Sequence, residues 1–399
     1  MSLIPATFAD LMTLTRGSSG YRVGSSGYLE SISSNNPRID YDPVTYAVKG
    51  LLIENTTTNL FLYSEQFDNA AWSKASTSIS ANAAAAPTNS VAADSLVENG
   101  STAAHAVGQA ISFSSGYKYT FSVFVKGVER STIQLSVSTA LHGSTGTSFC
   151  NFDVFNGAVV RVGSNIESAS IVAYRNGWYR CIMTTKTTTA GGSYTAYIAA
   201  SDIADPTTPT PSYLGQFLPA AYLWGAQMER QGYASSYFTT TSVTGVRAAD
   251  SLILTSNSPW FSSTLGTLYT EFIPITSISQ AVASFDDNTA AEVIKVSLSN
   301  SDPYFTVIDN SSTQASLDAG TITSGSTSKM AVTFNQNSFK ACHNGGTVVT
   351  DSSGTLPTIT QLQLGKDSQA TPTYLNGHLR KIRYYPRVLT DAELVSLTS

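Results

Sequence analysis

Tryptophan rings are the side chains of this sequence whose chemistry best suits a sugar, because a flat indole can stack on the C–H face of a pyranose. Trp178 and Trp224 lie within strand-like alternation, in NGWYRC and YLWGAQ, so we expect them to anchor a core. Trp72 follows a polar turn that runs from Glu65 to Asn69. Trp72 is therefore the candidate for a ligand-facing ring, and a position in the core is the alternative.

The densest acidic loop is Asp286-Asp287-Asn288, and hard oxygen ligands of this kind suit calcium. Two adjacent carboxylates and an amide lack the alternating ligands of a dedicated calcium loop, so a solvated hairpin tip is the alternative. Asp94 and Glu98, in AADSLVENG, could likewise hold a structural ion in the first sandwich, or could simply be solvated. We retain Asp286 and Asp287 as the candidate ligands of a structural calcium ion.

Catalytic patterns are scarce. Glycoside cleavage needs two carboxyl groups about 5–10 Å apart across a groove, and the 27 acidic residues are scattered along the chain. The four histidines form no i, i+4 pair, and no G-x-S-x-G elbow follows an α/β pattern. The sequence thus predicts a protein that is not an enzyme and has no cofactor beyond that calcium.

Composition restricts the partners. Charged residues make up 12% of the 399, about half the usual share, so Ser, Thr, Asn and Gly must supply the polar surface. The net charge is −5 with no polybasic run, which argues against nucleic acid and anionic membranes. No apolar run reaches about 18 residues, and the N-terminus lacks a signal-peptide pattern. We expect no membrane insertion, and a protein that is made in the cytoplasm and stays there unless it leaves as part of an assembly.

Three cysteines, Cys150, Cys181 and Cys342, include no C-x-x-C pair, which argues against a zinc site. Cys150 and Cys181 lie in apolar strand-like runs that could be neighbours. A disulfide between them and two buried free thiols are both compatible with the sequence.

Alternating strands dominate the chain and predict an all-β protein. In GYKYTFSVFVKG, the side chains of Phe121, Val123 and Val125 fall on one face, and those of Ser122 and Phe124 fall on the other. Similar period-2 runs recur between Gly, Asn and Ser clusters, which is typical of antiparallel strands in sandwiches rather than βαβ units.

We divide the chain into four regions. Residues 1–50 form an extended Gly/Ser-rich arm that is too poor in apolar groups to fold alone, and residues 51–253 form a first β-sandwich. Residues 254–266 are a linker, and residues 267–399 form a second sandwich. Leu51 to Tyr63 is expected to pack the arm onto the first sandwich and to begin its sheet.

The end of the chain carries a specific local signal. Thr390-Asp391-Ala392-Glu393 is a capping box, in which Thr390 and Glu393 satisfy each other's backbone amides. A short helix with an apolar stripe should follow and close one end of the second sandwich.

Several blocks resemble tailed-bacteriophage virion proteins of the tail-fibre, tail-spike, head-fibre or decoration type. They begin with TRGSSGYRVGSSGYLE, NNPRIDYDPVT and KGLLIENTTTNLFLYSEQFDNAAW, and continue with YTFSVFVKG, NGWYRC, LWGAQMERQGYASSYFTTT and VRAADSL. The ending, NGHLRKIRYYPRVLTDAELVSL, resembles that of laminin-G or concanavalin-like lectin domains. One departure is Thr57, where the family often carries an arginine, so any ion pair of that arginine is absent.

The resemblance implies a carbohydrate-binding-module-like jelly roll followed by a concanavalin/LamG-like lectin sandwich, in a virion protein. The arm would dock onto other virion proteins, and a homo-oligomer, most simply a trimer, would cover exposed strand edges. We expect a fibre adhesin that binds host-surface glycans. The alternatives are a capsid or tail decoration protein without tight sugar binding and, from a different class, a polysaccharide depolymerase.

Overall fold

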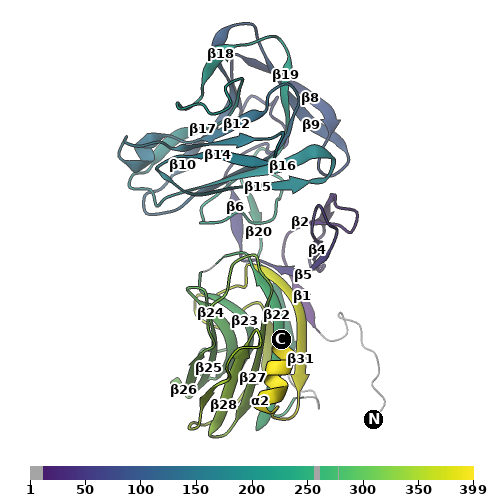
Figure 1. The fold of residues 1–399 in the computed structure, drawn as a ribbon, viewed down its shortest axis with the longest axis vertical. Helices are drawn as coiled ribbons and strands as arrows, with labels where there is room; N and C mark the ends of the chain where they lie inside the picture. Colours follow the sequence, from purple (N-terminus) through teal and green to yellow (C-terminus); the bar gives the residue numbers. More distant parts are fainter. Residues whose placement is uncertain (1–11, 256–260, 277) are drawn as a thin grey trace.

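The computed structural model describes residues 12–255, 261–276 and 278–399, and the part of the predicted linker at 256–260 lies outside these residues. Nearly all regular structure is antiparallel β-sheet, which confirms the predicted fold class. Two sandwiches lie one above the other in Figure 1, with β6 (Thr57–Asn59) and β20 (Gly245–Arg247) paired between them. No helix of the described residues is long and apolar enough to cross a membrane.

The N-terminal sandwich packs two sheets face to face. The six-stranded sheet has the order β15 (Ile166–Tyr174), β16 (Trp178–Thr185), β11 (Thr120–Gly127), β19 (Pro219–Glu229), β9 (Val91–Glu98) and β8 (Thr77–Ala85). The facing sheet has the order β14 (Ala158–Val162), β13 (Phe149–Asp153), β12 (Thr132–Ser136), β17 (Gly192–Ser201), β10 (Thr102–Phe113) and β18 (Ser212–Leu214), and β7 (Ser73–Ala75) also pairs with β10. Short 3-10 turns lie at Thr139–His142 and Arg175–Gly177.

The alternation predicted for β11 explains how this sandwich is filled. Phe121, Val123 and Val125 point into the core between the two sheets, and all are buried. Phe124 points out of the opposite face, yet it is also fully buried. Its cover comes from the N-terminal segment, where β2 (Gly20–Val23) and β3 (Leu29–Ile32) form a hairpin whose Val23 and Leu29 join the same apolar cluster.

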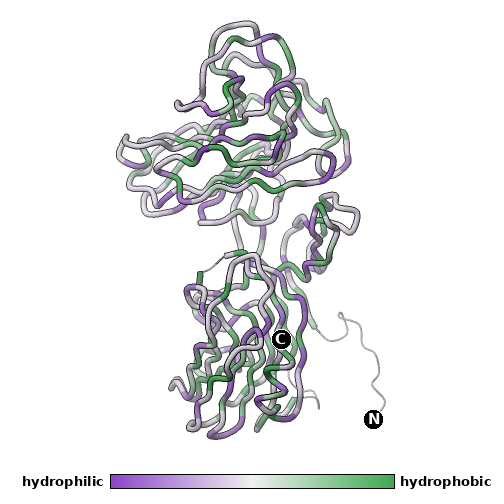
Figure 2. Tube along the Cα trace, in the orientation of Figure 1, coloured by the Kyte–Doolittle hydropathy of each residue, from purple (hydrophilic) through white to green (hydrophobic). Residues whose placement is uncertain are grey.

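The C-terminal sandwich has two sheets of seven strands each. One has the order β1 (Thr13–Thr15), β21 (Ser251–Thr255), β30 (Gln361–Leu364), β23 (Gln280–Asp286), β24 (Val293–Ser299), β25 (Asp302–Asp309) and β26 (Ser312–Asp318). The other has the order β29 (Val349–Asp351), β28 (Ser338–His343), β27 (Ser328–Asn335), β22 (Leu265–Pro274), β31 (Gly377–Tyr385), β5 (Val48–Ile53) and β4 (Ile39–Tyr41). Figure 2 shows hydrophobic stretches along the strands of both sandwiches.

Three strands of the C-terminal sandwich come from the start of the chain. β5 pairs with β31, β4 pairs with β5, and β1 pairs with β21, so residues 12–53 complete both sheets. Leu51 and Ile53 are buried in the core of this sandwich. The boundary drawn at residue 51 is therefore misplaced: β5 belongs to the second sandwich, and the chain first enters the core of the N-terminal sandwich at Phe61. Residues 12–50 bury their apolar side chains only together with the two sandwiches.

Gly50 allows β5 to lie this close to β31. Its φ is +126°, and a Cβ at this position would lie 2.6 Å from the carbonyl oxygen of Leu379. The register of β4 and β5 shifts at the same place, between Asp40 and Tyr41. A side chain at residue 50 would push the two strands apart, so only glycine fits.

The capping box predicted at the C-terminus is present. Helix α2 (Asp391–Thr398) begins after Thr390, whose side chain accepts from the Glu393 amide while the Glu393 carboxylate accepts from the Thr390 amide. Its Leu394 packs on Tyr269 and Ala331. Since neighbouring Leu268 points into the core, α2 covers the outer face of the sheet rather than one end of the sandwich.

Candidate functional site

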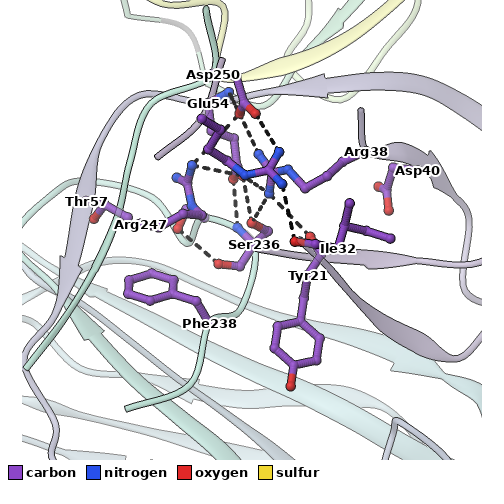
Figure 3. A network of polar contacts seen from close by, with 12 residues as sticks. Tyr21, Ile32, Arg38, Asp40, Glu54, Thr57, Ser236, Phe238, Arg247 and Asp250 are labelled. Atoms are coloured by element: carbon purple, nitrogen blue, oxygen red, sulfur yellow. Dashed lines mark hydrogen bonds and ion pairs between the residues drawn. The ribbon is translucent and has the colours of Figure 1, made fainter. Parts of the chain in front are cut away.

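A cluster of five buried charges lies where the N-terminal segment meets both sandwiches, and Figure 3 labels its members Arg38, Glu54, Arg247 and Asp250. Its members each lie at or just beyond the end of a strand: Arg16 after β1, Arg38 before β4, Glu54 after β5, Arg247 in β20 and Asp250 before β21. All five side chains are at most 1% exposed. We call these five residues the buried charge cluster.

Two carboxylates hold the three guanidinium groups together. Arg38 donates to both: its Nη1 lies 2.8 Å from Glu54 Oε2, and its Nη2 lies 2.6 Å from Asp250 Oδ2. Arg16 Nη1 lies 3.0 Å from Asp250 Oδ1, and Arg247 Nη1 lies 3.5 Å from Glu54 Oε2. The cluster therefore ties β1, β4 and β5 to the segment that leads from one sandwich to the next.

The N-terminal sandwich is tied to the same cluster through Ser236. Its backbone amide and its hydroxyl donate to the Glu54 carboxylate at 2.7 and 2.6 Å. Burial alone would raise the pKa of Glu54, but attraction to Arg247 and Arg38 and these hydrogen bonds lower it to about 2. Three guanidinium groups against two carboxylates leave one excess positive charge, 3 − 2 = +1, buried at the junction.

A cleft of about 220 Å³ opens beside the cluster, which reaches it through Glu54. Its walls come from three parts of the chain: the N-terminal segment, the outer face of the six-stranded sheet and the C-terminal sandwich. We call it the junction cleft; its lining includes Tyr21, Asp40, Lys49, Tyr174, Arg180 and His378.

Asp40 and His378 form the wall that faces the C-terminal sandwich. His378 Nε2 lies 2.8 Å from Asp40 Oδ2, and the amide of Val23 donates to Asp40 Oδ1 at 2.7 Å. Both side chains are buried, and His378 Nδ1 has no hydrogen-bond partner among the described residues. This wall therefore keeps one polar atom unsatisfied.

Arg180 forms the wall on the N-terminal sandwich. Its Nη1 donates to the Ser235 carbonyl at 2.8 Å, its Nη2 donates to Ser122 Oγ at 2.9 Å, and its guanidinium lies 5.4 Å from the ring centre of Phe124. Within the described part of the chain, Arg180 has no carboxylate within 4 Å, and its Nε has no hydrogen-bond partner. Tyr21 and Tyr174 are half-buried and line the same space.

Trp72, the candidate for a ligand-facing ring, lies in the core instead. It is 1% exposed and lies between Phe61 and Phe67, with ring centres 4.9 and 4.8 Å away. Its Nε1 donates to the Tyr63 carbonyl at 3.0 Å. The polar turn before it folds over the ring instead of leaving it open, so no sugar can stack there. Trp178 and Trp224 are core residues, as predicted.

Asp286 and Asp287 do not converge on a common point. Asp286 is fully buried, and its carboxylate accepts from neutral side chains: Gln361 at 2.7 Å, Gln363 at 3.0 Å and Ser284 at 2.8 Å. Asp287 accepts from the amide and hydroxyl of Thr289 instead. The described residues contain no group of three or more His, Cys, Asp or Glu that could hold a metal. Calcium here stays a prediction.

The other residues considered from the sequence have structural roles. Asp94 accepts from the amides of Phe67 and Asn82, and Glu98 is paired with Arg130. Cys150, Cys181 and Cys342 are buried free thiols. Thr57 donates to the buried Glu229 carboxylate at 3.1 Å, so a hydroxyl stands where the family often has an arginine.

The C-terminal part of the chain matches a known protein family. Residues 253–395 match the laminin-G family model described as the concanavalin A-like lectin/glucanases superfamily. The C-terminal sandwich is concanavalin-like. No curated protein matches the chain.

Among solved structures, the CBM40 domain of a Ruminococcus gnavus sialidase bound to α2,3-sialyllactose is 14% identical, with 35% of this chain and 84% of that chain covered and a TM-score of 0.31. Laminin α1 domains LG4-5 from mouse are 10% identical, with 71% and 89% covered and a TM-score of 0.27. The CBM22 tandem of Paenibacillus barcinonensis Xyn10C is 11% identical, with 83% and 98% covered and a TM-score of 0.27. At these TM-scores, the likenesses imply nothing about the ligands of this chain.

The junction residues were missed in the sequence for a physical reason. Arg38, Glu54 and Asp250 each look like an ordinary polar residue next to a strand, and only the fold brings them within 3 Å of one another. A usable signal was present: in a chain with 12% charged residues, PRIDYD, LLIEN and VRAAD each place a charge against apolar or strand-like sequence.

Proposed function

We propose that this protein is a glycan-binding attachment protein that works without catalysis, as a component of a bacteriophage virion. The observation that carries the proposal is the junction cleft, which combines half-buried tyrosines with charged side chains between two sandwiches. Small-molecule sites are concave and occur preferentially at domain interfaces, where a few polar groups converge among aromatic ones. The concanavalin-like fold of the C-terminal sandwich and the sequence blocks that resemble phage virion proteins support the same function.

Rigid attachment of the two sandwiches suits this role. The buried charge cluster fixes the N-terminal segment against both sandwiches, so the cleft keeps its shape without a ligand. A single small site gives weak binding, and display of many copies on one particle would raise the overall avidity.

A glycan array with the full-length chain tests the proposal. The chain should be displayed multivalently, for example on streptavidin-coated beads, and compared with a bead-bound Tyr174→Ala variant. We expect binding to a defined class of bacterial surface glycans, and weaker binding by the variant. Binding to no glycan and to no host envelope would refute the proposal. Release of reducing ends from a bound polysaccharide would show instead that the protein is a depolymerase.

A decoration protein is the second candidate, and exposed apolar residues of the N-terminal sandwich favour it. Edge strand β14 leaves Val160 and Val162 40% and 48% exposed, and neighbouring Phe155 is 52% exposed. An unpaired apolar edge of this kind is suited to burial against another subunit. Particle imaging would decide between the two: attachment requires the junction cleft to face outward, whereas decoration requires β14 to be buried against the shell.

A further inference from the structure

The charges around the junction cleft do not balance. Asp40 and Glu54 are its carboxylates, and both already have cationic or hydrogen-bonding partners: His378 for Asp40, Arg38 for Glu54. Among its cations, Lys49 and Arg180 have no carboxylate within 4 Å in the part of the chain that the structure describes. Asp42 interacts electrostatically with Lys49, and the buried Glu229 does so with Arg180, but neither carboxylate makes a direct ion pair with its cation. Both cations can therefore still pair directly with a ligand.

The buried charge cluster adds to this field from behind the wall. Its excess of one positive charge lies in a region that water does not reach, where charges are screened much less than at the surface. An anion in the cleft would be attracted both by the lining cations and by this excess charge.

An anion in the cleft would be stabilised most next to Arg180. The residue is 7% exposed, and its guanidinium is charged at any pH that the fold tolerates. A buried charge that makes no direct ion pair is costly, and a polar atom without a hydrogen-bond partner adds to that cost. A ligand carboxylate near Arg180 would offset both costs, because charge-assisted hydrogen bonds are about twice as strong as neutral ones.

The aromatic walls of the cleft suit the ring of a sugar. Tyr21 and Tyr174 are half-buried, and Phe124 and Tyr237 pack behind them. The volume of about 220 Å³ lies below the roughly 300–1,000 Å³ of sites for drug-sized ligands, so the cleft is small enough to select a single sugar unit.

We propose that the junction cleft binds an acidic saccharide unit, with its carboxylate at Arg180 and Lys49 and its ring against Tyr21 and Tyr174. A uronic or sialic acid residue at the end of a surface glycan has this chemistry. This inference rests on the proposed function, because it names the class of glycan that the attachment site takes.

Ligand-observed NMR on the full chain tests the choice of ligand. The probes are methyl glucuronide, methyl glucoside, which has a neutral hydroxymethyl group in place of the carboxylate, and sodium acetate, which lacks the ring. We expect saturation transfer to the glucuronide, at least about tenfold weaker binding of the glucoside, and no displacement of the glucuronide by equimolar acetate. Equal binding of glucuronide and glucoside would overturn the inference, and displacement by acetate would show an anion site without sugar selectivity.

Three variants locate the site. Lys49→Gln removes a half-buried cation at the cleft, and Ala234→Phe fills the cleft from a half-buried position without removing charge. Each should weaken glucuronide binding at least about fivefold. Lys186→Gln makes the same charge change at an exposed position outside the cleft and should leave binding unchanged. All variants should keep the melting temperature of the parent, which separates loss of binding from loss of fold.

The failures of the two proposals are distinguishable. If Lys49→Gln and Ala234→Phe bind the glucuronide as the parent does, the acidic-sugar site in this cleft is refuted. Glycan-array binding that survives in those variants would then leave the attachment function in place with a site elsewhere. If neither the array nor the NMR detects any sugar, both proposals fail.

Discussion

Replacing Asp250 by asparagine perturbs the junction most sharply. Asp250 accepts from Arg16 at 3.0 Å, from Arg38 at 2.6 Å and from the amide of Glu54 at 3.0 Å, and its side chain is 1% exposed. Asparagine preserves the shape but removes the negative charge, so the cluster changes from an excess of one positive charge to an excess of two. Removing one partner of a buried ion pair typically costs about 3–5 kcal/mol, because the remaining charge stays buried without compensation.

Urea unfolding followed by circular dichroism measures this cost. With a slope of about 3 kcal/mol per molar urea, a loss of that size lowers the midpoint of the first transition by about 1–2 M. The matched control is Glu167→Gln, which neutralises a carboxylate paired with Lys118 on the surface, where both side chains are about 40% exposed. It should change the stability by less than about 1 kcal/mol. The reasoning is wrong if Asp250→Asn is as stable as this control.

Three other perturbations probe separate parts of the structure. A fragment of residues 251–399 keeps β21 but lacks β1, β4 and β5, so it should bind the dye ANS and aggregate. Fusing residues 12–54 to it through a flexible linker should restore a cooperative melting transition, and a well-folded fragment would contradict the pairing of β5 with β31. The fold lowers the pKa of Glu54 from 4.5 to about 2, so the ionised carboxylate contributes about 3 kcal/mol to the free energy of unfolding. This contribution is complete above pH 4.5 and is lost as the pH falls toward 2. Glu54→Gln should abolish that part of the acid dependence of the melting temperature, and an unchanged acid profile would be inconsistent with this role. Trp72→Ala should destabilise the protein by about 3–5 kcal/mol and leave glycan affinity per folded molecule unchanged, whereas a specific loss of binding would restore the ligand-facing role.

Local patterns in the sequence predicted local structure well. The alternation around Phe121 identified both faces of β11, and Thr390 with Glu393 marked the first turn of α2. These signals depend on side chains that are close in sequence and obey fixed periods.

Strand partners were beyond the reach of the same patterns. The apolar run Leu51-Leu52-Ile53 shows that a strand is buried, but nothing in it shows that the partner is β31, whose residues 377–379 lie more than 300 positions away. Alternation determines which face of a strand is apolar, and pairing depends on which unpaired edge the rest of the fold leaves open. The junction cleft was missed for the same reason, because Tyr21, Arg180 and His378 come from three separate sheets.

Hydrogen–deuterium exchange of the full chain, with and without the glycan that binds best on the array, tests the junction cleft most directly as the binding site. We expect slower exchange in the presence of glycan in β2, in β15 and β16, and around residues 234–237, which together line the cleft. Unchanged exchange in all of these segments, with protection confined to the far loops of either sandwich, would contradict glycan binding at the junction.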